Sequence, residues 1–276
     1  MSAAGIFWIA SYPKSGNTWV RCLIASLLAG GGTPDLARLG TPTAANRNWL
    51  ERVLSVPVED LTQEELTGMR AEAHRLWASI GSGPRCLKVH DGYRPDLFPP
   101  ALTAGAVYIV RDPRDVAPSW GAHMTVPVDR AIADMGRADM VQASNSARYQ
   151  TDAPQALGSW SQHVLSWLDG PRPPPLLLRY EDMLADPPGQ AARLAAHLGL
   201  AADRTAVAGA VAACRFDRLQ AAEAAEGFVE RPDKMARFFR QGRAGAWRSA
   251  LTAGQAARIE ADHGGVMARL GYLGGA

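Results

Sequence analysis

The segment IFWIASYPKSGNTWVRCLIASLL, residues 6 to 28, constrains the fold of this chain more than any other. Its first residues, Ile6 to Ala10, are all apolar, as in a strand that is buried on both faces. Pro13 interrupts the run, and an apolar helical pattern begins near Thr18. A strand that passes so quickly into a helix leaves the first N–H groups of the helix unpaired, at the positive end of its dipole. The sequence therefore predicts an anion site at this turn.

The residues of the turn fit a phosphate-like group. Gly16 permits tight curvature and close approach of a ligand, while Ser15, Asn17 and Thr18 supply hydroxyl and amide donors and Lys14 a positive charge. An ordinary turn capped by Ser15 or Asn17 is the alternative, but it gives no role to Lys14. The pattern is not the Walker A motif GxxxxGK[ST], because the lysine precedes the glycine.

Further along the chain, short apolar runs alternate with helical patterns. Expected strands are residues 86 to 89, 106 to 110, and 176 to 178 with Arg179, and expected helices are 18–28, 60–79, 115–123, 159–168, 189–198, 206–214 and 255–270. This alternation predicts an α/β fold with a P-loop-like, doubly wound parallel sheet flanked by helices, which binds ligands at the carboxyl ends of its strands. No linker composition divides the chain, so we expect one domain over residues 1 to 276. The remaining long segments, 29–59, 124–156 and 220–242, lack clear periodicity and are candidate binding loops or lids.

Composition narrows the classes of partner. The chain has 29 basic and 27 acidic residues, so it has no broad positive field and nucleic acid is not an expected partner. Its three cysteines are scattered without a CxxC spacing, which fits a reducing compartment better than disulfides or a zinc site. There is no basic leader and no apolar stretch of membrane-spanning length. We expect a cytoplasmic protein with no membrane partner.

The turn also carries a family resemblance. "YPKSGNTW", Tyr12 to Trp19, resembles the 5′-phosphosulfate loop of sulfotransferases that use 3′-phosphoadenosine 5′-phosphosulfate (PAPS), whose usual form is TYPKSGTTW. The resemblance implies that PAPS is the co-substrate and adenosine 3′,5′-bisphosphate (PAP) the product. It also implies that Trp19 packs on the adenine and that five consecutive residues bind the 5′-phosphate. These residues are Lys14, Ser15, Gly16, Asn17 and Thr18.

A second stretch, "VYIVRDPRDVAPSW" at 107 to 120, resembles the family's 3′-phosphate motif. An arginine and a serine eight residues apart, here Arg111 and Ser119, bind that phosphate in the family, and the arginine fork suits bidentate bonds to it. For the acidic residues we expect structural roles: Asp112 in a strand-end ion pair with Arg111, and Asp115 as a charge at the start of a helix.

A third stretch, "LKVHDGY" at 87 to 93, resembles the KTH segment that supplies the catalytic histidine of the family. It implies catalytic roles for His90 and Lys88, although Val89 stands where threonine is usual. His90 follows a strand, and an imidazole with an ordinary pKa of ~6.5 can accept the proton of a hydroxyl. The other histidines are expected to be structural: His74, His123, His163, His197 and His263.

A fourth stretch, "GSWSQHVLSWLDG…LLLRYEDMLADP" at 158 to 187, resembles the family's YEDM region. Tyr180 matches a tyrosine that contacts adenine. Trp160, Trp167 and Met183 are expected in the core. Glu181 and Asp182 are adjacent, so their side chains point in different directions and do not form a catalytic pair.

The C-terminal stretch "FFRQGRAGAWRSALT", 238 to 252, resembles the RKGxxGxW motif that closes over the 3′-phosphate. Arg240 and Gly242 agree with the motif, while Gln241 stands at the binding position where lysine is usual. Arg243 could supply the positive charge that is lost there. "CRFDRL" at 214 to 219 aligns with a TSF segment and implies that Phe216 packs on adenine, with Cys214 in place of threonine. The family's dimer motif, KxxxTVxxxE, is degraded to "RSALTAGQAA", so the oligomeric state is open.

Together these stretches imply in-line transfer of a sulfuryl group from PAPS to a hydroxyl. His90 takes the proton, Lys14 meets the bridging oxygen, Lys88 helps neutralise the transferred group, and Ser119 restrains Lys14 until an acceptor arrives. No metal is required. Likeness to bacterial tailoring sulfotransferases favours a small-molecule or natural-product acceptor, bound by residues 29–59, 124–156 and 220–238. The last segment is expected to be a mobile lid that orders on binding, and a solvated connection with no closing role is the alternative. A P-loop kinase-like phosphotransferase and a non-catalytic nucleotide-binding protein are the alternatives.

Overall fold

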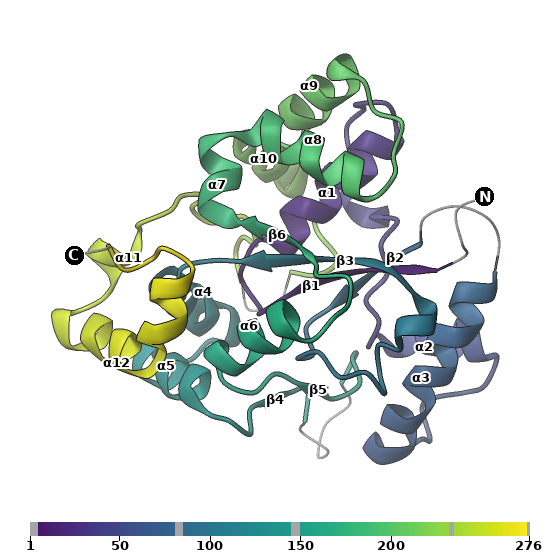
Figure 1. Cartoon of the computed structure of the whole chain (residues 1–276), viewed down its shortest axis with the longest axis horizontal. Helices are drawn as coiled ribbons and strands as arrows, with labels where there is room; N and C mark the ends of the chain where they lie inside the picture. Colours follow the sequence, from purple (N-terminus) through teal and green to yellow (C-terminus); the bar gives the residue numbers. More distant parts are fainter. Residues whose placement is uncertain (1–4, 81–84, 145–149, 232–234, 275–276) are drawn as a thin grey trace. The chain divides into compact units, whose positions relative to one another are not determined.

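The four apolar runs form the strands of one parallel sheet (Figure 1), in a computed structural model that describes residues 5–80, 85–144, 150–231 and 235–274. The strands are β1 (Ile6–Ser11), β2 (Arg85–Val89), β3 (Thr103–Val110) and β6 (Leu176–Arg179). Their order is β2-β1-β3-β6. The chain therefore moves to one side of β1 to form β2 and then returns to the other side for β3 and β6. A reversal of this kind is where ligands bind in open α/β sheets.

Helices flank this central sheet, as the sequence predicted. The strand and helix positions expected from the apolar patterns are confirmed to within a few residues. Capping residues account for several of the helix starts: Thr62, Ser159 and Thr252 each head a capping box. The helices are α1 (Asn17–Leu28), α2 (Arg47–Leu54), α3 (Gln63–Ser79), α4 (Pro113–Met124), α5 (Val128–Gly136), α6 (Trp160–Asp169), α7 (Tyr180–Ala185), α8 (Pro187–His197), α9 (Arg204–Ala213), α10 (Phe216–Glu226), α11 (Trp247–Ala250) and α12 (Ala253–Arg269).

The segments expected to be loops contain regular structure, which corrects that prediction. Residues 29–59 include α2, residues 124–156 include α5 and the short antiparallel strands β4 (Val141–Gln142) and β5 (Gln155–Ala156), and residues 220–242 begin inside α10. The helices α2 and α5 have only two or three turns, too short for a periodic pattern to stand out. Residues 145–149 and 232–234 of these segments lie outside the described residues.

The chain divides into two compact units. Unit 1 is Met1–Tyr12, Thr41–Tyr108 and Arg137–Leu177, and unit 2 is Pro13–Gly40, Ile109–Gly136 and Leu178–Ala276. Unit 1 holds β1, β2, most of β3, α2, α3 and α6. Unit 2 holds α1, α4, α5 and α7 to α12. Every residue predicted to bind the nucleotide belongs to unit 2, whereas Lys88 and His90 belong to unit 1.

Each unit has its own core. In unit 1, Trp8 packs edge-on against His74 and Phe98, and Trp160 and Trp167 are fully buried, as predicted. In unit 2, α1 packs on α8 and α9, and α4 packs on α5, α11 and α12. Met183 is also buried, as predicted. The free cysteines Cys22, Cys86 and Cys214 are buried, and burial raises the pKa of the Cys86 and Cys214 thiols to about 12.

Candidate functional site

The turn between β1 and α1 in unit 2 has the backbone that an anion site needs. Lys14 and Gly16 both have positive φ, at 69° and 106°. Gly16 is the N-cap residue of α1 and has no side chain to cap the first turn, and the first turn has no acidic residue. Ser15 is fully buried, and its Oγ has no hydrogen-bond partner in the structure. Asn17 and Thr18 are buried at the start of α1. The first turn of α1 therefore offers N–H groups and a buried hydroxyl to a ligand.

Tyr180 explains why residue 16 must be glycine. A Cβ added to Gly16 would lie 2.8 Å from Cδ2 of Tyr180. The same ring meets Trp19 edge-on, with centroids 5.7 Å apart, and lies under the Arg111 guanidinium, 4.4 Å from Cζ. Two of the aromatic residues predicted to contact adenine thus pack beside the predicted phosphate loop.

Arg111 connects the β1–α1 turn to the C-terminal loop. One terminal nitrogen of Arg111 donates to the Lys14 carbonyl at 3.4 Å, and the other donates to the Arg243 carbonyl at 3.0 Å. Its Nε is buried and has no partner in the structure. Arg111, expected at the 3′-phosphate, therefore contacts the backbone of Lys14, expected at the 5′-phosphate, within unit 2.

A second cluster in unit 2 is aromatic. Phe216 packs so closely on Gly242 that an added Cβ would collide with its ring. Phe239 meets Phe216 edge-on at 6.5 Å, and the neighbouring Phe238 lies beneath the Lys14 ammonium, 4.4 Å from its ring centroid. The structure therefore brings together Phe216 and Gly242, two residues predicted to bind different parts of the nucleotide, and joins them to Lys14 through the two phenylalanines.

Three predicted binding residues have no interaction of this kind. Arg240 and Gln241 are exposed and Ser119 is half-buried, and none of them has a hydrogen bond or ion pair within the described residues. In the described part of the chain no hydrogen bond joins the Ser119 and Lys14 side chains, and the Lys14 ammonium lies over Phe238. The restraint of Lys14 by Ser119 stays a prediction.

The segment expected to form a lid is held by ion pairs and backbone bonds. Glu230 pairs with the buried Arg21 of α1 at 2.6 Å. Glu223 of α10, 2% exposed, accepts the backbone N–H groups of Phe238 and Phe239 at 2.6 and 3.0 Å. The described parts of the lid, 220–231 and 235–238, are thus tied to α1 and α10.

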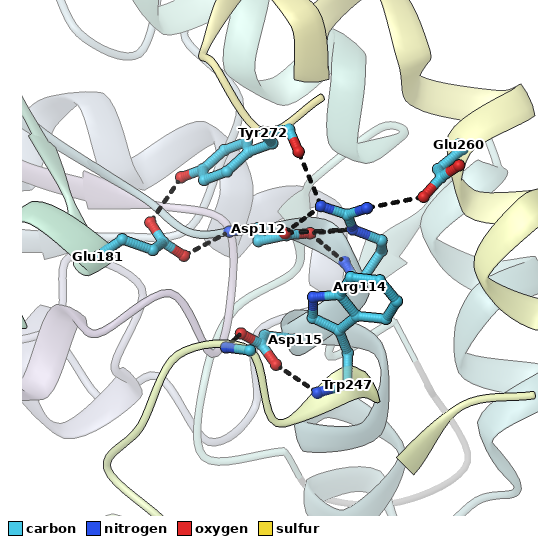
Figure 2. A network of polar contacts seen from close by, with 8 residues as sticks. Asp112, Arg114, Asp115, Glu181, Trp247, Glu260 and Tyr272 are labelled. Atoms are coloured by element: carbon cyan, nitrogen blue, oxygen red, sulfur yellow. Dashed lines mark hydrogen bonds and ion pairs between the residues drawn. The ribbon is translucent and has the colours of Figure 1, made fainter. Parts of the chain in front are cut away.

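Figure 2 shows a polar network at the end of β3 and the start of α4, also within unit 2. Arg114 makes a forked contact with Asp112, at 2.7 Å for the closest pair, and also pairs with Glu260 of α12 at 2.7 Å. It donates in addition to the Tyr272 carbonyl at 2.8 Å. The predicted partner of Asp112 was therefore wrong: the ion pair is with Arg114 and not with Arg111, because the Asp112 carboxylate caps α4 and turns toward residue 114.

The two acidic residues of the YEDM stretch have different partners, and only Glu181 belongs to this network. Glu181 accepts from the Asp112 N–H at 3.0 Å and from the Tyr272 hydroxyl at 2.9 Å. Asp182 instead pairs with Arg179 at 3.0 Å. The two carboxylates thus have separate structural partners, as predicted.

His90 lies at the carboxyl edge of the sheet in unit 1. Ala10 of β1 pairs with Val89 of β2, so the residues that follow, Ser11 and His90, are neighbours. His90 Nδ1 lies 2.8 Å from the Ser11 carbonyl oxygen. A carbonyl only accepts, so Nδ1 carries the proton and, in the neutral imidazole, Nε2 carries the lone pair. Lys88 stands two residues earlier in β2, on the same side of the strand.

His163 of α6 orients the backbone of His90, a contact that the sequence did not predict. His163 Nε2 donates to the His90 carbonyl at 3.0 Å, and the Tyr108 hydroxyl donates to His163 Nδ1 at 2.8 Å. Burial lowers the pKa of His163 to about 4, so the ring is neutral at physiological pH. The classification of His163 as structural holds, but its partner is the backbone of the predicted catalytic residue.

A buried ion pair stands directly after His90. Arg70 of α3 and Asp91 are 1% and 2% exposed, and they contact at 2.6 Å. The Asp91 carboxylate also accepts from Ala156 N–H at 3.2 Å, and its carbonyl accepts from Trp167 Nε1 at 2.9 Å. The backbone after His90 is therefore fixed on several sides. No local sequence pattern marks this pair, because its two members are 21 positions apart.

Comparison with known proteins identifies the family. A family model described as "Sulfotransferase domain" matches residues 6–271. The chain belongs to the sulfotransferase domain family. Cytosolic sulfotransferase 17 of Arabidopsis thaliana is 27% identical over 270 residues, which is 92% of this chain and 72% of that protein. Sulfotransferase 1A1 of Rattus norvegicus is 25% identical over 269 residues, 94% of this chain and 83% of that protein.

A solved structure shares the fold of the sulfotransferase described here. A crystal structure of retinol dehydratase in complex with androsterone and the inactive cofactor PAP aligns with a TM-score of 0.63 at 22% identity, covering 97% of this chain and 81% of that one. Within the described ranges, no set of three or more His, Cys, Asp or Glu side chains is arranged to hold a metal ion. A search of the same residues finds no helix with the length and apolar character of a membrane span.

Proposed function

We propose that this protein transfers a sulfuryl group from PAPS to the hydroxyl of a small molecule. Membership of the sulfotransferase family supports the reaction class, and a relative of the same fold was crystallised with PAP. The observation that carries the proposal is the position of Arg111, which contacts both the β1–α1 turn and the C-terminal loop. Arg111, expected at the 3′-phosphate, thus lies beside Lys14, expected at the 5′-phosphate, which supports a doubly phosphorylated adenosine as the ligand.

The polar atoms of this cluster fit such a nucleotide. The Ser15 hydroxyl and the Arg111 Nε are both buried and have no hydrogen-bond partner among the described residues, a condition that costs free energy unless a ligand or water satisfies them. We assign the 5′-phosphate to the turn before α1, where Gly16 permits close approach and Asn17 and Thr18 begin the helix. Lys14 adds positive charge at the mouth of this turn.

The adenosine end is assigned to aromatic rings and to the C-terminal loop. Trp19, Tyr180 and Phe216 offer faces that can pack on a purine. The 3′-phosphate is assigned to five residues. One of them, Gln241, contributes an amide at the position where the motif usually has a lysine. These residues are Arg111, Ser119, Arg240, Gln241 and Gly242.

We assign the transfer step to three side chains. PAPS, when bound, supplies the sulfuryl group. His90 Nε2 takes the proton of the acceptor hydroxyl, and the Ser11 carbonyl, bonded to Nδ1–H, stabilises the imidazolium that forms. Lys14 supplies positive charge where the leaving phosphate gains negative charge, and Lys88 helps to neutralise the transferring group. The bonds of His163 and Asp91 to this region keep the His90 backbone in place.

The variant His90→Ala tests this assignment. We expect kcat to fall by about 10²- to 10⁴-fold, as is usual when a general base is removed, while calorimetry gives an unchanged Kd for PAP. His197→Ala, a half-buried histidine of α8 in unit 2, serves as the matched control and should retain activity. Turnover by His90→Ala within tenfold of the parent protein would remove His90 from the mechanism. A parent protein that binds PAP but transfers nothing to any acceptor would favour a non-catalytic role.

For the acceptor we propose a small molecule with a phenolic or alcoholic hydroxyl, such as a natural product. The two curated relatives described above carry the name sulfotransferase, and the solved neighbour binds androsterone. Incubating the protein with PAPS and a panel of phenols, sugars, nucleosides and glycopeptide aglycones tests the class, because each product gains the mass of one sulfuryl group. We also propose a cytoplasmic location, in line with the cytosolic relative, and a single sulfotransferase domain, since the family match extends over 6–271.

A further inference from the structure

Asp115 has a role that its position in the sequence does not reveal. It lies in the first turn of α4 and is 2% exposed. One carboxylate oxygen accepts the Gly245 N–H at 2.7 Å, and the other accepts the Trp247 N–H at 2.8 Å (Figure 2). Both oxygens are thus directed at the C-terminal loop, 240–247. A helix-start charge needs no such contacts, so the dipole interaction alone does not account for this residue.

Two neighbours of Asp115 contact the same loop. Arg111 donates to the Arg243 carbonyl at 3.0 Å, and the Arg114 guanidinium lies 4.1 Å from the Trp247 ring centroid. The loop is therefore held on both sides of Gly245 by side chains from residues 111 to 115. The bond from the Arg111 guanidinium and the two bonds to the Asp115 carboxylate are all charge-assisted, and such bonds are about twice as strong as neutral ones. Asp115 therefore supplies two of these three bonds to the loop.

The cations of the loop have no such anchor of their own. Arg240 and Arg243 are exposed, and neither has an ion pair in the described parts of the chain. A flexible arginine binds phosphate weakly unless its backbone is fixed, because ordering it on binding costs conformational entropy. Gln241 provides no charge to offset that loss. The affinity for a phosphate at this loop should therefore depend on what fixes its backbone.

We propose that Asp115 is a positioning residue that fixes the 240–247 loop beside Arg111, so that the loop and Arg111 grip the 3′-phosphate together. This inference rests on the proposed function for the location of that phosphate. Asp115 does not touch the nucleotide in this scheme, because a carboxylate would repel it. The two loop N–H groups offset part of the Asp115 charge and make an acidic residue compatible with a phosphate nearby.

Comparison of two nucleotides separates this role from a general effect on stability. PAP carries the 3′-phosphate and AMP lacks it, so the ratio of their Kd values measures the 3′ grip alone. Asp115→Ala removes both bonds to the loop, and we expect PAP binding to weaken by about tenfold or more, while the AMP Kd stays within about twofold. Asp115→Asn keeps one acceptor oxygen and should give an intermediate ratio.

Asp203→Ala is the matched control. Asp203 caps α9 in the same unit and accepts one backbone N–H, from Ala206 at 2.8 Å, and within the described residues none of its hydrogen bonds or ion pairs reaches the loop. We expect it to lower Tm without changing the ratio. An Asp115→Ala protein that binds PAP as tightly as the parent, or that loses PAP and AMP equally, would overturn the proposal. If Asp115→Ala does not fold, the ratio of the PAP and AMP Kd values for Asp115→Asn tests the proposal, and a ratio equal to that of the parent protein would overturn it. A parent protein that does not prefer PAP over AMP would refute the 3′-phosphate assignment itself, and that result is distinct from a failure of Asp115.

Discussion

Replacing Gly16 by alanine should damage the nucleotide site through two separate terms. The first is backbone strain, because φ is 106° at Gly16, and a left-handed conformation costs an L-residue about 1–2 kcal/mol. The second is overlap with Tyr180, whose Cδ2 would lie 2.8 Å from the new methyl group. Overpacking of this kind costs about 1–3 kcal/mol. The Tyr180 ring lies between Arg111 and Trp19, and therefore cannot move away without disturbing the predicted phosphate cluster.

Urea unfolding and PAP titration measure the two outcomes of Gly16→Ala. We expect about 2–5 kcal/mol of lost stability, the sum of the two terms, or a smaller loss accompanied by a weaker Kd where Tyr180 is displaced. Gly30→Ala is the matched control, because Gly30 also has positive φ, 66°, and has no atom within 4 Å of an added Cβ. It should show the backbone term alone. Adding Tyr180→Ala to Gly16→Ala should remove the overlap term. Equal losses for Gly16→Ala and Gly30→Ala would refute the steric argument.

Three further predictions follow from the buried and substituted residues. Burial lowers the pKa of His74 and of His163 from 6.5 to about 4. Between about pH 6.5 and pH 4 the unfolded chain therefore binds protons that the folded protein does not, and the free energy of unfolding at pH 5.5 should be about 3 kcal/mol below that at pH 7.5. An unchanged urea midpoint would contradict this. Arg70→Ala leaves Asp91 buried and unpaired and should cost about 3–5 kcal/mol in urea unfolding, whereas Arg70→Met with Asp91→Leu should recover most of it. Gln241→Lys restores the cation of the motif at an exposed position, so PAP should bind roughly two- to fivefold more tightly, in line with an exposed ion pair, and a gain that persists at high salt would argue against a Coulombic cause.

The parts of this fold that the sequence predicted are those with a local signal. The four strands were visible because each consists mostly of apolar residues, with Lys88 as an exception inside β2, and the β1–α1 turn was visible because Pro13 and Gly16 interrupt the apolar pattern. The aromatic residues of the core, such as Trp160 and Trp167, followed from their size and from the helical pattern around them. In all these cases, the residues that form the signal are neighbours in the chain.

The parts that the sequence did not predict depend on contacts between distant residues. Asp115 was interpreted from its place at the start of α4, yet its partners are in the loop at Gly245 and Trp247. His163 was classed as structural, but no pattern indicated that it would donate to the His90 carbonyl. Glu223 lies in a segment predicted to be irregular, and its role in binding the backbone at Phe238 required α10 to be known.

The hydrogen bond between His90 and Ser11 has a consequence for mutagenesis. The Ser11 carbonyl lies 2.8 Å from Nδ1 of the imidazole, and the Ser11 hydroxyl lies 3.4 Å from the same nitrogen. The closer group belongs to the main chain, so a small residue such as alanine at this buried position still supplies it. An alanine scan would detect the loss of the His90 imidazole, but it would not detect the role of the Ser11 carbonyl oxygen, which fixes the tautomer. Side-chain variation at this position is therefore compatible with an unchanged proton acceptor, and only a change in the backbone, such as an ester in place of the amide that contains this carbonyl, would reveal its contribution.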